Sequence, residues 1–297
     1  MLPRTEQLLH QLKAAADPVR LRLLALCRHG ECSVSELTGV LGLSQPRMSQ
    51  QLKVLCDAGL LERFRDGQRR YYRWPAGGRE GATRRQLLRL LPDDEPQFAD
   101  DASRLRQLRA RDGGAEVPAS ASDRALHRAI MDLTVTAPVG DLLDIGCGRG
   151  ALLKLLSSRA NQAVGVDIDA GARDLARNEL LLAGLQNCSL RKGDMYHLPF
   201  AEHSYDTIIL DDVLRTAERP LAALQEAARV LRPGGRLLLL LRVIGGDAAR
   251  QQADMAAWCA EAGLRLTPSR LVPRNQPAWM LAVACPTEAH QHTTAAA

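Results

Sequence analysis

The sequence lacks three patterns that would point away from a globular cytoplasmic protein. Its seven cysteines form neither a dense framework nor a Cys-x-x-Cys pair, so disulfides are not expected and a reducing compartment is favoured. No stretch approaches the roughly 18–20 apolar residues that a membrane helix needs. The first residues also lack the apolar core of a signal peptide. We therefore expect a cytoplasmic protein with no membrane partner.

Length and charge together indicate two modules with different tasks. The chain has 297 residues, of which 46% are hydrophobic and 25% charged, enough for two domains with packed cores. Residues 1–92 carry 16 Lys and Arg against 8 Asp and Glu, a net charge of +8, whereas residues 93–297 carry 23 against 26, a net charge of −3. A basic N-terminal module predicts a polyanionic partner such as nucleic acid, although a solvated basic face would show the same charge.

The first ninety residues predict short helices followed by a β-hairpin. Leucines recur at helical spacing over residues 6–16 and 19–27. Ser33, followed three residues later by Glu36, is typical of a capping box, and Ser44 is placed to cap a further helix. The resulting order is helix, turn, helix.

The helix that begins after Ser44 is predicted to read DNA. Its apolar residues fall on one face and its polar residues on another, and arginine and glutamine can recognise guanine and adenine in the major groove. Strand-like runs flank Asp66-Gly67, a signal for a two-residue hairpin whose arginines suit phosphates, or simply protect a solvated edge. The candidate DNA-binding residues are Ser44, Gln45, Arg47, Gln50, Gln51, Lys53, Arg65, Arg69 and Arg70.

A connector separates this module from a longer one. We predict a DNA-binding domain over residues 1–92, a helical linker over 93–122, a second domain over 123–286 and a disordered tail over 287–297. The linker contains a predicted helix over 98–111 and a flexible joint beginning at Gly113-Gly114.

The second domain shows alternating strands and helices. Strands are predicted over 142–145, 163–166, 207–210 and 236–241, with helices over 152–159 and 171–185 between the first three. This order is typical of a mostly parallel sheet covered on both faces.

A glycine-rich loop and two aspartates mark a candidate ligand site in this domain. The segment Asp144-Ile-Gly-Cys-Gly-Arg-Gly150 follows an apolar strand and opens a helix, so its backbone can approach a nucleotide-like ligand closely. Taken alone, the loop also fits a dinucleotide fingerprint with Ala151 in third place. Asp167 ends the next strand, where a carboxylate can accept hydrogen bonds from ribose hydroxyls. Asp194 and Met195 follow a third strand and suit an adenine amino group and ring, although turn chemistry would also explain each aspartate.

The N-terminal motifs resemble the ArsR/SmtB family of winged helix-turn-helix repressors over residues 5–90. The resemblance is carried by Ala16-Asp-Pro-Val-Arg-Leu-Arg-Leu-Leu, Leu43-Ser-Gln-Pro-Arg-Met-Ser-Gln-Gln-Leu-Lys and Arg70-Tyr-Tyr-Arg. It implies a mainly α domain with a β-hairpin wing, and a homodimer that binds a palindromic double-stranded DNA operator.

One departure from that family concerns metal sensing. Many members have a Cys-Val-Cys motif where this chain has Ser33-Val34-Ser35, so the thiolates that soft metals need are missing and no metal is expected. A thiol switch involving Cys27, Cys32 or Cys56 stays open beside the alternative that these are small buried core residues.

The later motifs resemble a class I S-adenosylmethionine-dependent methyltransferase domain, an α/β Rossmann-like sheet, over residues 123–286. They include the glycine loop, Lys192-Gly-Asp-Met and Leu231-Arg-Pro-Gly-Gly-Arg. The resemblance implies S-adenosylmethionine or S-adenosylhomocysteine as ligand, with Asp144 and Gly146 near the methionine part and Leu210 and Asp211 near the sulfonium. The candidate cofactor-binding residues are Asp144, Gly146, Gly148, Gly150, Asp167, Ile168, Asp194, Met195, Leu210 and Asp211.

The methyl acceptor is only weakly indicated. The Asn-His or His-His element that related small-molecule enzymes show after the fourth strand is replaced here by Asp211-Asp212, which makes Asp212 the candidate catalytic base or cation clamp. An Asn-Pro-Pro-Tyr-like signature of nucleic-acid methylation is absent. Three interpretations follow: a regulator that senses the cofactor, similar to S-adenosylhomocysteine-responsive ArsR-type regulators, an active small-molecule methyltransferase with a DNA-binding domain, and a thiol or metal sensor.

Overall fold

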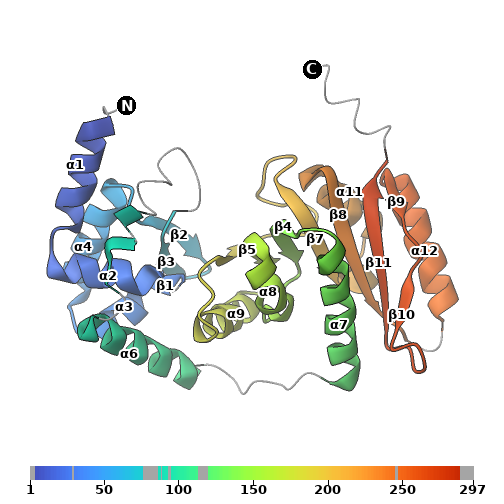
Figure 1. Ribbon diagram of the computed structural model, residues 1–297, viewed down its shortest axis with the longest axis horizontal. Helices are drawn as coiled ribbons and strands as arrows, with labels where there is room; N and C mark the ends of the chain where they lie inside the picture. Colours follow the sequence, from blue (N-terminus) through green and yellow to red (C-terminus); the bar gives the residue numbers. More distant parts are fainter. Residues whose placement is uncertain are drawn as a thin grey trace. The chain divides into compact units, whose positions relative to one another are not determined.

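The computed structural model describes residues 4–28, 30–75, 86–87, 89–92, 95–112, 120–244 and 247–287 of the chain (Figure 1). The chain forms two compact units. The N-terminal unit comprises Met1–Gly114 together with Arg177–Gln186, and the C-terminal unit comprises Ala115–Ala176 and Asn187–Ala297. Most of the predicted flexible joint, and the predicted tail beyond residue 287, lie outside the described residues.

The N-terminal unit is a helical domain with a small antiparallel sheet, as predicted for a winged helix-turn-helix. The elements are α1 (Arg4–Ala15), α2 (Pro18–Arg28), β1 (Cys32–Ser33), α3 (Val34–Leu41), α4 (Gln45–Asp57), β2 (Glu62–Asp66), β3 (Arg69–Arg73) and α6 (Pro96–Asp112). The sheet order is β1-β3-β2. Buried leucines from α2, α3 and α4, together with Leu105 of α6, form one core.

Local sequence signals explain where these helices begin and end. Asp17 accepts hydrogen bonds from the backbone N–H groups of Val19 and Arg20, at 2.9 and 3.0 Å, and so caps α2. Ser33 and Glu36 form the predicted capping box of α3. Gly42 closes α3 in the left-handed conformation, with a φ of 66°.

The hairpin turn differs from the prediction by one residue. Asp66 pairs with Arg69 in the ladder of β2 and β3, so the two turn residues are Gly67 and Gln68 instead of Asp66 and Gly67. Gly67 supplies the positive φ of 57° that a tight hairpin needs. Asp66 is buried, which holds it in the strand.

The C-terminal unit contains one large sheet whose strands are mostly parallel, as predicted. Its strands are β4 (Gly140–Ile145), β5 (Ala160–Asp167), β6 (Cys188–Lys192), β7 (Tyr205–Asp211), β8 (Leu231–Arg242), β9 (Leu264–Leu266), β10 (Arg270–Val272) and β11 (Trp279–Pro286). The order is β10-β11-β8-β7-β4-β5-β6, and β9 pairs with β11. The pairs from β6 through to β8 are parallel, whereas β9, β10 and β8 each pair antiparallel with β11.

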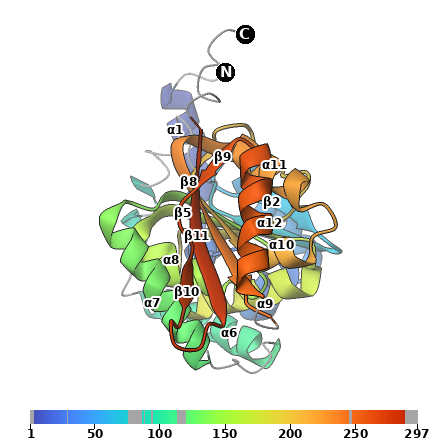
Figure 2. The ribbon, with the colours of Figure 1, turned by 90° about the vertical axis from the view of Figure 1, so that its right-hand side faces the viewer.

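Helices cover both faces of this sheet. Figure 2 shows α7 (Ala121–Thr136) and α8 (Ala151–Leu156) on one side and α11 (Pro220–Val230) and α12 (Ala248–Glu261) on the other. The remaining helical segments are a 3-10 turn (Ser157–Arg159), α9 (Ala170–Leu182) and α10 (Val213–Thr216). Within the described part of the chain, none of the helices combines the length and apolar character needed to cross a membrane.

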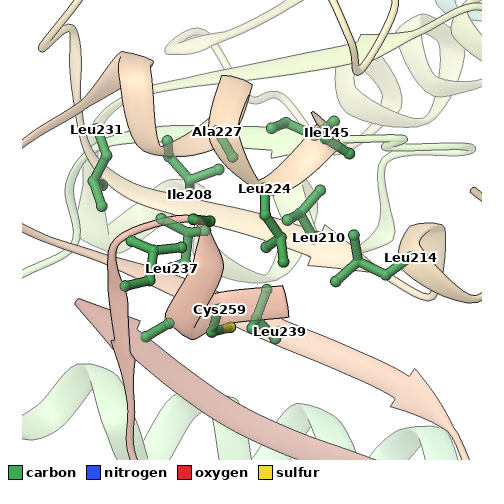
Figure 3. Close-up of a cluster of buried hydrophobic side chains, with 14 of the residues drawn as sticks. Ile145, Ile208, Leu210, Leu214, Leu224, Ala227, Leu231, Leu237, Leu239 and Cys259 are labelled. Carbon is green, nitrogen blue, oxygen red and sulfur yellow. The ribbon is translucent and has the colours of Figure 1, made fainter. Parts of the chain in front are cut away.

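The core beneath α11 and α12 explains the leucine run of β8. Leu237 and Leu239 pack in a cluster with Leu224 of α11 and Cys259 of α12 (Figure 3). Leu241 belongs to the same cluster. The alternate residues Leu238 and Leu240 are also buried, so the strand is covered on both faces and needs an apolar residue at every position.

The strand order places a switch point between β4 and β7. From β4 the chain proceeds outward through β5 and β6, then returns to pair β7 on the other side of β4. Ligands of open α/β sheets bind outside the carboxyl ends of the strands at such a point. The predicted glycine loop follows β4, so the sheet topology and the sequence motif indicate the same position for a ligand site.

Candidate cofactor site and DNA interface

The loop after β4 is built around three glycines with positive φ. Gly146, Gly148 and Gly150 have φ values of 74°, 51° and 77°, which other residues rarely adopt. A side chain at Gly146 would also meet Val213 of α10, because an ideal Cβ there lies 2.5 Å from Val213 Cγ2. Gly150 forms the N-cap of α8. The loop therefore presents bare backbone at the switch point.

Asp167, at the end of β5, is joined to that loop. Its Oδ2 accepts a hydrogen bond from the N–H of Gly148 at 2.9 Å, and its Oδ1 accepts one from the N–H of Asp169 at 2.9 Å. A carboxylate offers about four acceptor positions, so both oxygens keep capacity for further donors such as ribose hydroxyls. Ile168 follows with 68% of its surface exposed, an apolar side chain beside the predicted ribose position.

Two carboxylates at the switch point have buried oxygens with no hydrogen-bond partner. They are Oδ1 of Asp144 on β4 and Oδ1 of Asp211 on β7. Burial, with the nearby charges of Asp211 and Asp167, raises the pKa of Asp144 well above its usual value. Burial, with the charge of Asp212, raises the pKa of Asp211 to about 6. Buried acceptors are normally satisfied, so this pair favours a ligand that brings hydrogen-bond donors and positive charge.

The predicted adenine residues lie after β6. Asp194 is exposed, and its Oδ1 accepts a hydrogen bond from the N–H of Tyr196 at 3.0 Å, which fixes the turn. Met195 is half-buried and packs against the core of the C-terminal unit. An exposed carboxylate beside a partly buried thioether fits the polar edge and the face of a purine.

Two other predicted site residues, Leu210 and Asp212, have side chains that are engaged by neighbouring residues. The side chain of Leu210 lies in the core, so only its backbone can face a ligand (Figure 3). Both oxygens of Asp212 accept hydrogen bonds from the guanidinium of Arg215, at 3.0–3.1 Å, and Oδ1 also accepts the N–H of Arg242 at 3.0 Å. Asp212 has a φ of 55°, and these contacts anchor the turn after β7. A base at Asp212 would have to release Arg215 first.

The structure adds an aromatic and charged cluster that the sequence did not indicate. The indole N–H of Trp279 on β11 donates to Oδ1 of Asp123 on α7 at 3.1 Å. The guanidinium of Arg242 lies over the Trp279 ring, 4.3 Å from its centroid, and 3.7 Å from Asp123 Oδ1. Arg242 and Asp123 both influence Asp211. The cluster therefore lies beside the switch-point carboxylates, although its members are far apart in the sequence.

A cavity of about 310 Å³ lies at the end of the sheet opposite the switch point. His203, Leu231 and Leu264 are among its lining residues, close to the starts of β7, β8 and β9. None of the predicted cofactor residues lines it. The cavity is thus separate from the switch point.

The predicted reading helix, α4, has the two faces that its sequence indicates. Met48, Leu52 and Leu55 are fully buried, whereas Arg47, Gln50 and Lys53 are exposed. Ser44 and Gln45 at the start of the helix are exposed as well, and Ser44 occupies the N-cap position without a side-chain capping bond. The side-chain oxygen Oε1 of Gln51 accepts a hydrogen bond from the guanidinium of Arg20 at 3.1 Å, which orients the Gln51 side chain.

The hairpin supplies a set of exposed arginines. Arg65, Arg69 and Arg70 are exposed, and Arg65 donates to the carbonyl oxygen of Gly67 at 3.1 Å. Arg73 differs, because it is buried and paired with Glu31 at 2.8 Å and also with Glu62. The exposed arginines can contact phosphates, whereas Arg73 belongs to the interior.

The cysteines near α2 and α3 lie in the core. Cys27 and Cys32 are buried as free thiols. A hydrogen bond with Cys32, together with burial, raises the pKa of Cys27 well above its usual value, which disfavours the reactive thiolate. Burial raises the pKa of Cys56 to about 11. Among the residues that the structure describes, no group of three or more His, Cys, Asp and Glu could hold a metal ion.

The fold and the two sites define a winged helix-turn-helix domain and an α/β domain with a candidate cofactor site. Comparison with known families assigns each of the two domains to a family. Residues 17–63 match the family described as "Bacterial regulatory protein, arsR family", and residues 143–239 match the family described as "Methyltransferase domain". The chain therefore carries an arsR-family helix-turn-helix followed by a methyltransferase domain, as the motifs predicted.

Similar proteins match only parts of the chain. An uncharacterized 37.1 kDa protein in transposon TN4556 of Streptomyces fradiae is 32% identical over 148 residues, which are 49% of this chain and 40% of that protein. The ubiquinone/menaquinone biosynthesis C-methyltransferase UbiE of Legionella pneumophila (strain Paris) is 35% identical over 117 residues, 38% of this chain and 47% of that protein. The chain thus spans less than half the length of these two curated relatives.

A solved structure is similar to this chain at low sequence identity. The SAM-dependent methyltransferase from Aquifex aeolicus is 18% identical, with a TM-score of 0.49, and covers 60% of this chain and 97% of its own. At the switch point of this chain, the orphaned oxygens of Asp144 and Asp211 suit a cationic hydrogen-bond donor.

Proposed function

We propose that this protein is a DNA-binding transcriptional regulator whose methyltransferase domain binds S-adenosylmethionine or S-adenosylhomocysteine as a sensed ligand. In this proposal the N-terminal unit binds a double-stranded operator as a homodimer, with α4 in the major groove and the hairpin arginines on phosphates. Binding of the ligand changes the affinity for DNA because the ligand has different affinities for two states of the protein.

The pair of unpartnered carboxylate oxygens carries this proposal. Both ligands have an α-ammonium group that can donate to a buried carboxylate, and Asp144 and Asp211 offer buried acceptors at the switch point. Asp167 would hold the ribose hydroxyls, while Asp194 and Met195 would face the adenine. The glycine loop from Gly146 to Gly150 would contact the ligand through its backbone.

Asp211 also provides a way to distinguish the two ligands. S-adenosylmethionine carries a sulfonium charge, whereas the sulfur of S-adenosylhomocysteine is neutral. A carboxylate near that sulfur favours the charged form when it is ionised. A sensor built on this site would respond to the ratio of the two compounds.

The engagement of Asp212 favours sensing over catalysis. The candidate base is already bonded to Arg215 and to the backbone of Arg242. General base catalysis needs a group within hydrogen-bond reach of the proton it removes and free to accept it. Binding without turnover makes no such demand.

Calorimetry combined with DNA titration tests the proposal. Each sulfur nucleoside is titrated into the full-length protein, and the affinity for a duplex selected in vitro on the same protein is then measured with and without it. We expect saturable heat from at least one nucleoside and a change in DNA affinity of about 5-fold or more. Well-folded protein that gives no heat with either compound would disprove cofactor binding, and heat without any change in DNA affinity would disprove sensing.

A second candidate function is an active small-molecule methyltransferase. Asp211 favours it, because a carboxyl group whose pKa is about 6 can take up or release a proton near neutral pH. UbiE, a relative of the domain, is named a methyltransferase. Steady conversion of S-adenosylmethionine to S-adenosylhomocysteine that depends on an added acceptor, and that is lost in Asp211→Asn, would establish the enzyme.

A further inference from the structure

The second half of helix α9 carries a buried arginine that holds two carboxylates of the N-terminal unit. Nε of Arg177 donates to Oε2 of Glu31 at 2.9 Å, and Nη2 donates to Oδ2 of Asp66 at 2.5 Å. All three side chains are buried, with 3–4% of their surface exposed. The guanidinium also lies over the ring of Tyr71, 4.1 Å from its centroid. Arg177 is therefore fixed by charge, hydrogen bonds and an aromatic face together.

The two carboxylates belong to the wing and its neighbouring strand. Asp66 is the last residue of β2, next to the hairpin turn, where a charged residue is usually solvated. Glu31 precedes β1, and its other oxygen accepts a hydrogen bond from Arg73 of β3 at 2.8 Å. Burying charges is unfavourable unless they are paired, and Arg177 supplies each of these carboxylates with a buried cation. The hairpin with the DNA-binding arginines is thus tied to α9.

The first half of α9 is linked by hydrogen bonds to Asp167, the candidate ribose-binding residue. Arg173, one helical turn before Arg177, donates to the carbonyl oxygen of Asp167 at 2.7 Å. Oδ1 of Asp169 accepts the N–H of Ala172 at 2.7 Å, in the first turn of the helix, and the N–H of Asp169 donates to the carboxylate of Asp167. A ligand that draws the Asp167 carboxylate toward its ribose therefore acts on the start of α9.

We propose that Arg177 couples ligand binding at Asp167 to the wing, acting as a positioning residue through Asp66 and Glu31. This inference rests on the proposed function and names the regulation of that site. Helix α9 is continuous from Ala170 to Leu182, so a displacement of its first turn moves Arg177 with it. Moving the guanidinium away would cost each buried carboxylate an ion pair, so the hairpin follows the guanidinium. The wing then has two arrangements whose balance the ligand sets.

Hydrogen exchange measured on the full-length protein tests this coupling directly, with S-adenosylhomocysteine as the probe. Amide exchange is followed over residues 62–73 with and without the probe, and calorimetry on the same samples shows whether the probe binds. The variants are Arg177→Ala, which removes the guanidinium, and Arg177→Lys, which keeps the charge but loses the two-pronged contact. Arg265→Ala, at an exposed arginine of β9, is the matched control. Asp66→Asn serves as a milder second variant if Arg177→Ala unfolds.

The expected result has two parts. The probe changes wing exchange in the wild type and in Arg265→Ala, and this change is lost in Arg177→Ala, in Arg177→Lys and in Asp66→Asn, while the affinity for the probe stays within about 2-fold. Without the probe, wing exchange is about tenfold faster in Arg177→Ala than in the wild type. A probe that binds the wild type without altering wing exchange, or that alters it equally in the folded Arg177 or Asp66 variants, would overturn the coupling and leave ligand binding intact. A probe that does not bind at all would overturn the proposed function and the coupling with it.

Discussion

The backbone N–H of Gly148 donates to Oδ2 of Asp167, and this 2.9 Å hydrogen bond joins the glycine loop after β4 to the end of β5. One carboxylate thus shapes the loop and is also the candidate ribose acceptor. The two roles of Asp167 cannot be changed independently, which makes it the most informative residue for mutation.

Replacing Asp167 by alanine is expected to abolish cofactor binding without unfolding the protein. The variant loses the ribose acceptor and leaves the N–H groups of Gly148 and Asp169 without their partner, at a cost of about 1–3 kcal/mol. Calorimetry with both sulfur nucleosides and thermal unfolding check the two effects. Asp254→Asn, at an exposed position of α12, is the control. Wild-type affinity in Asp167→Ala would show that the ligand lies elsewhere.

The variant Asp211→Asn is expected to be more stable than the wild type at pH 8 and equally stable at pH 3.5. The pKa of Asp211 is raised in the folded protein from 3.8 to about 6, so ionisation of this group disfavours the folded state. The penalty is absent below the unfolded pKa of 3.8 and complete above about 6, and it is on the order of 2 kcal/mol.

Thermal or urea unfolding across this pH range tests the prediction for Asp211. The variant should become progressively more stable than the wild type between pH 4 and pH 6, and the difference in stability should stay constant above pH 6. A variant that is less stable than the wild type at pH 8 would mean that the Asp211 carboxylate is satisfied in the free protein.

The preference for S-adenosylmethionine over S-adenosylhomocysteine is expected to rise as the pH increases from 5 to 7. Ionisation of Asp211 over this range adds a negative charge that attracts a sulfonium and leaves a neutral thioether unaffected. Calorimetric affinities for both compounds at several pH values give the ratio, which should increase several-fold. In Asp211→Asn the ratio of the two affinities should not vary with pH. If the ratio in the wild type does not vary with pH either, the sulfur does not lie near Asp211.

Arginines of α4 and of the hairpin are expected to differ in how they affect DNA binding. Arg47→Ala should weaken binding to a selected duplex by about 1–3 kcal/mol and affect a scrambled duplex much less, because Arg47 is exposed on the reading helix. Arg70→Ala should weaken both duplexes alike and reduce the number of counterions released on binding by about one, because Arg70 is proposed to contact phosphate. Fluorescence anisotropy over a salt series measures both.

Arg104→Ala is the control for these two variants, since Arg104 is an exposed arginine of α6 that pairs with Asp100. If Arg47→Ala weakened the selected and scrambled duplexes by the same factor, α4 would not be reading bases.

The sequence predicted most of the structural features that depend on residues close together in the chain. Capping at Ser33 and Glu36, the apolar face with Met48 and Leu52, and the parallel strands around the glycine loop depend on neighbours a few residues away or on simple periodicity. These features were therefore within reach of the sequence. The switch point was not, because it depends on the order of the strands in the sheet, which only the structure gives.

The parts that depend on distant residues were missed. Strands β9 and β10 have three residues each and are held by pairing with β11, so no periodicity could reveal them. The strand predicted over 236–241 is longer in the structure, because β8 begins at Leu231 and its register with β7 shifts near that end. Trp279 reaches Asp123 across 156 positions of sequence, and Arg177 reaches Glu31 across 146. Charged residues are usually assigned to the surface, so a buried ion cluster gives no sequence signal.

The division of the chain has a consequence for any truncated version of the protein. The N-terminal unit includes Arg177–Gln186, which follow its first 114 residues only after an intervening stretch of the other unit. A fragment that stops at Gly114 would contain Glu31 and Asp66 without the Arg177 guanidinium that pairs with both, and its core would lack Leu181. During synthesis, too, Glu31 and Asp66 cannot pair with Arg177 until the ribosome has passed that residue, so the interior of the N-terminal unit is completed late.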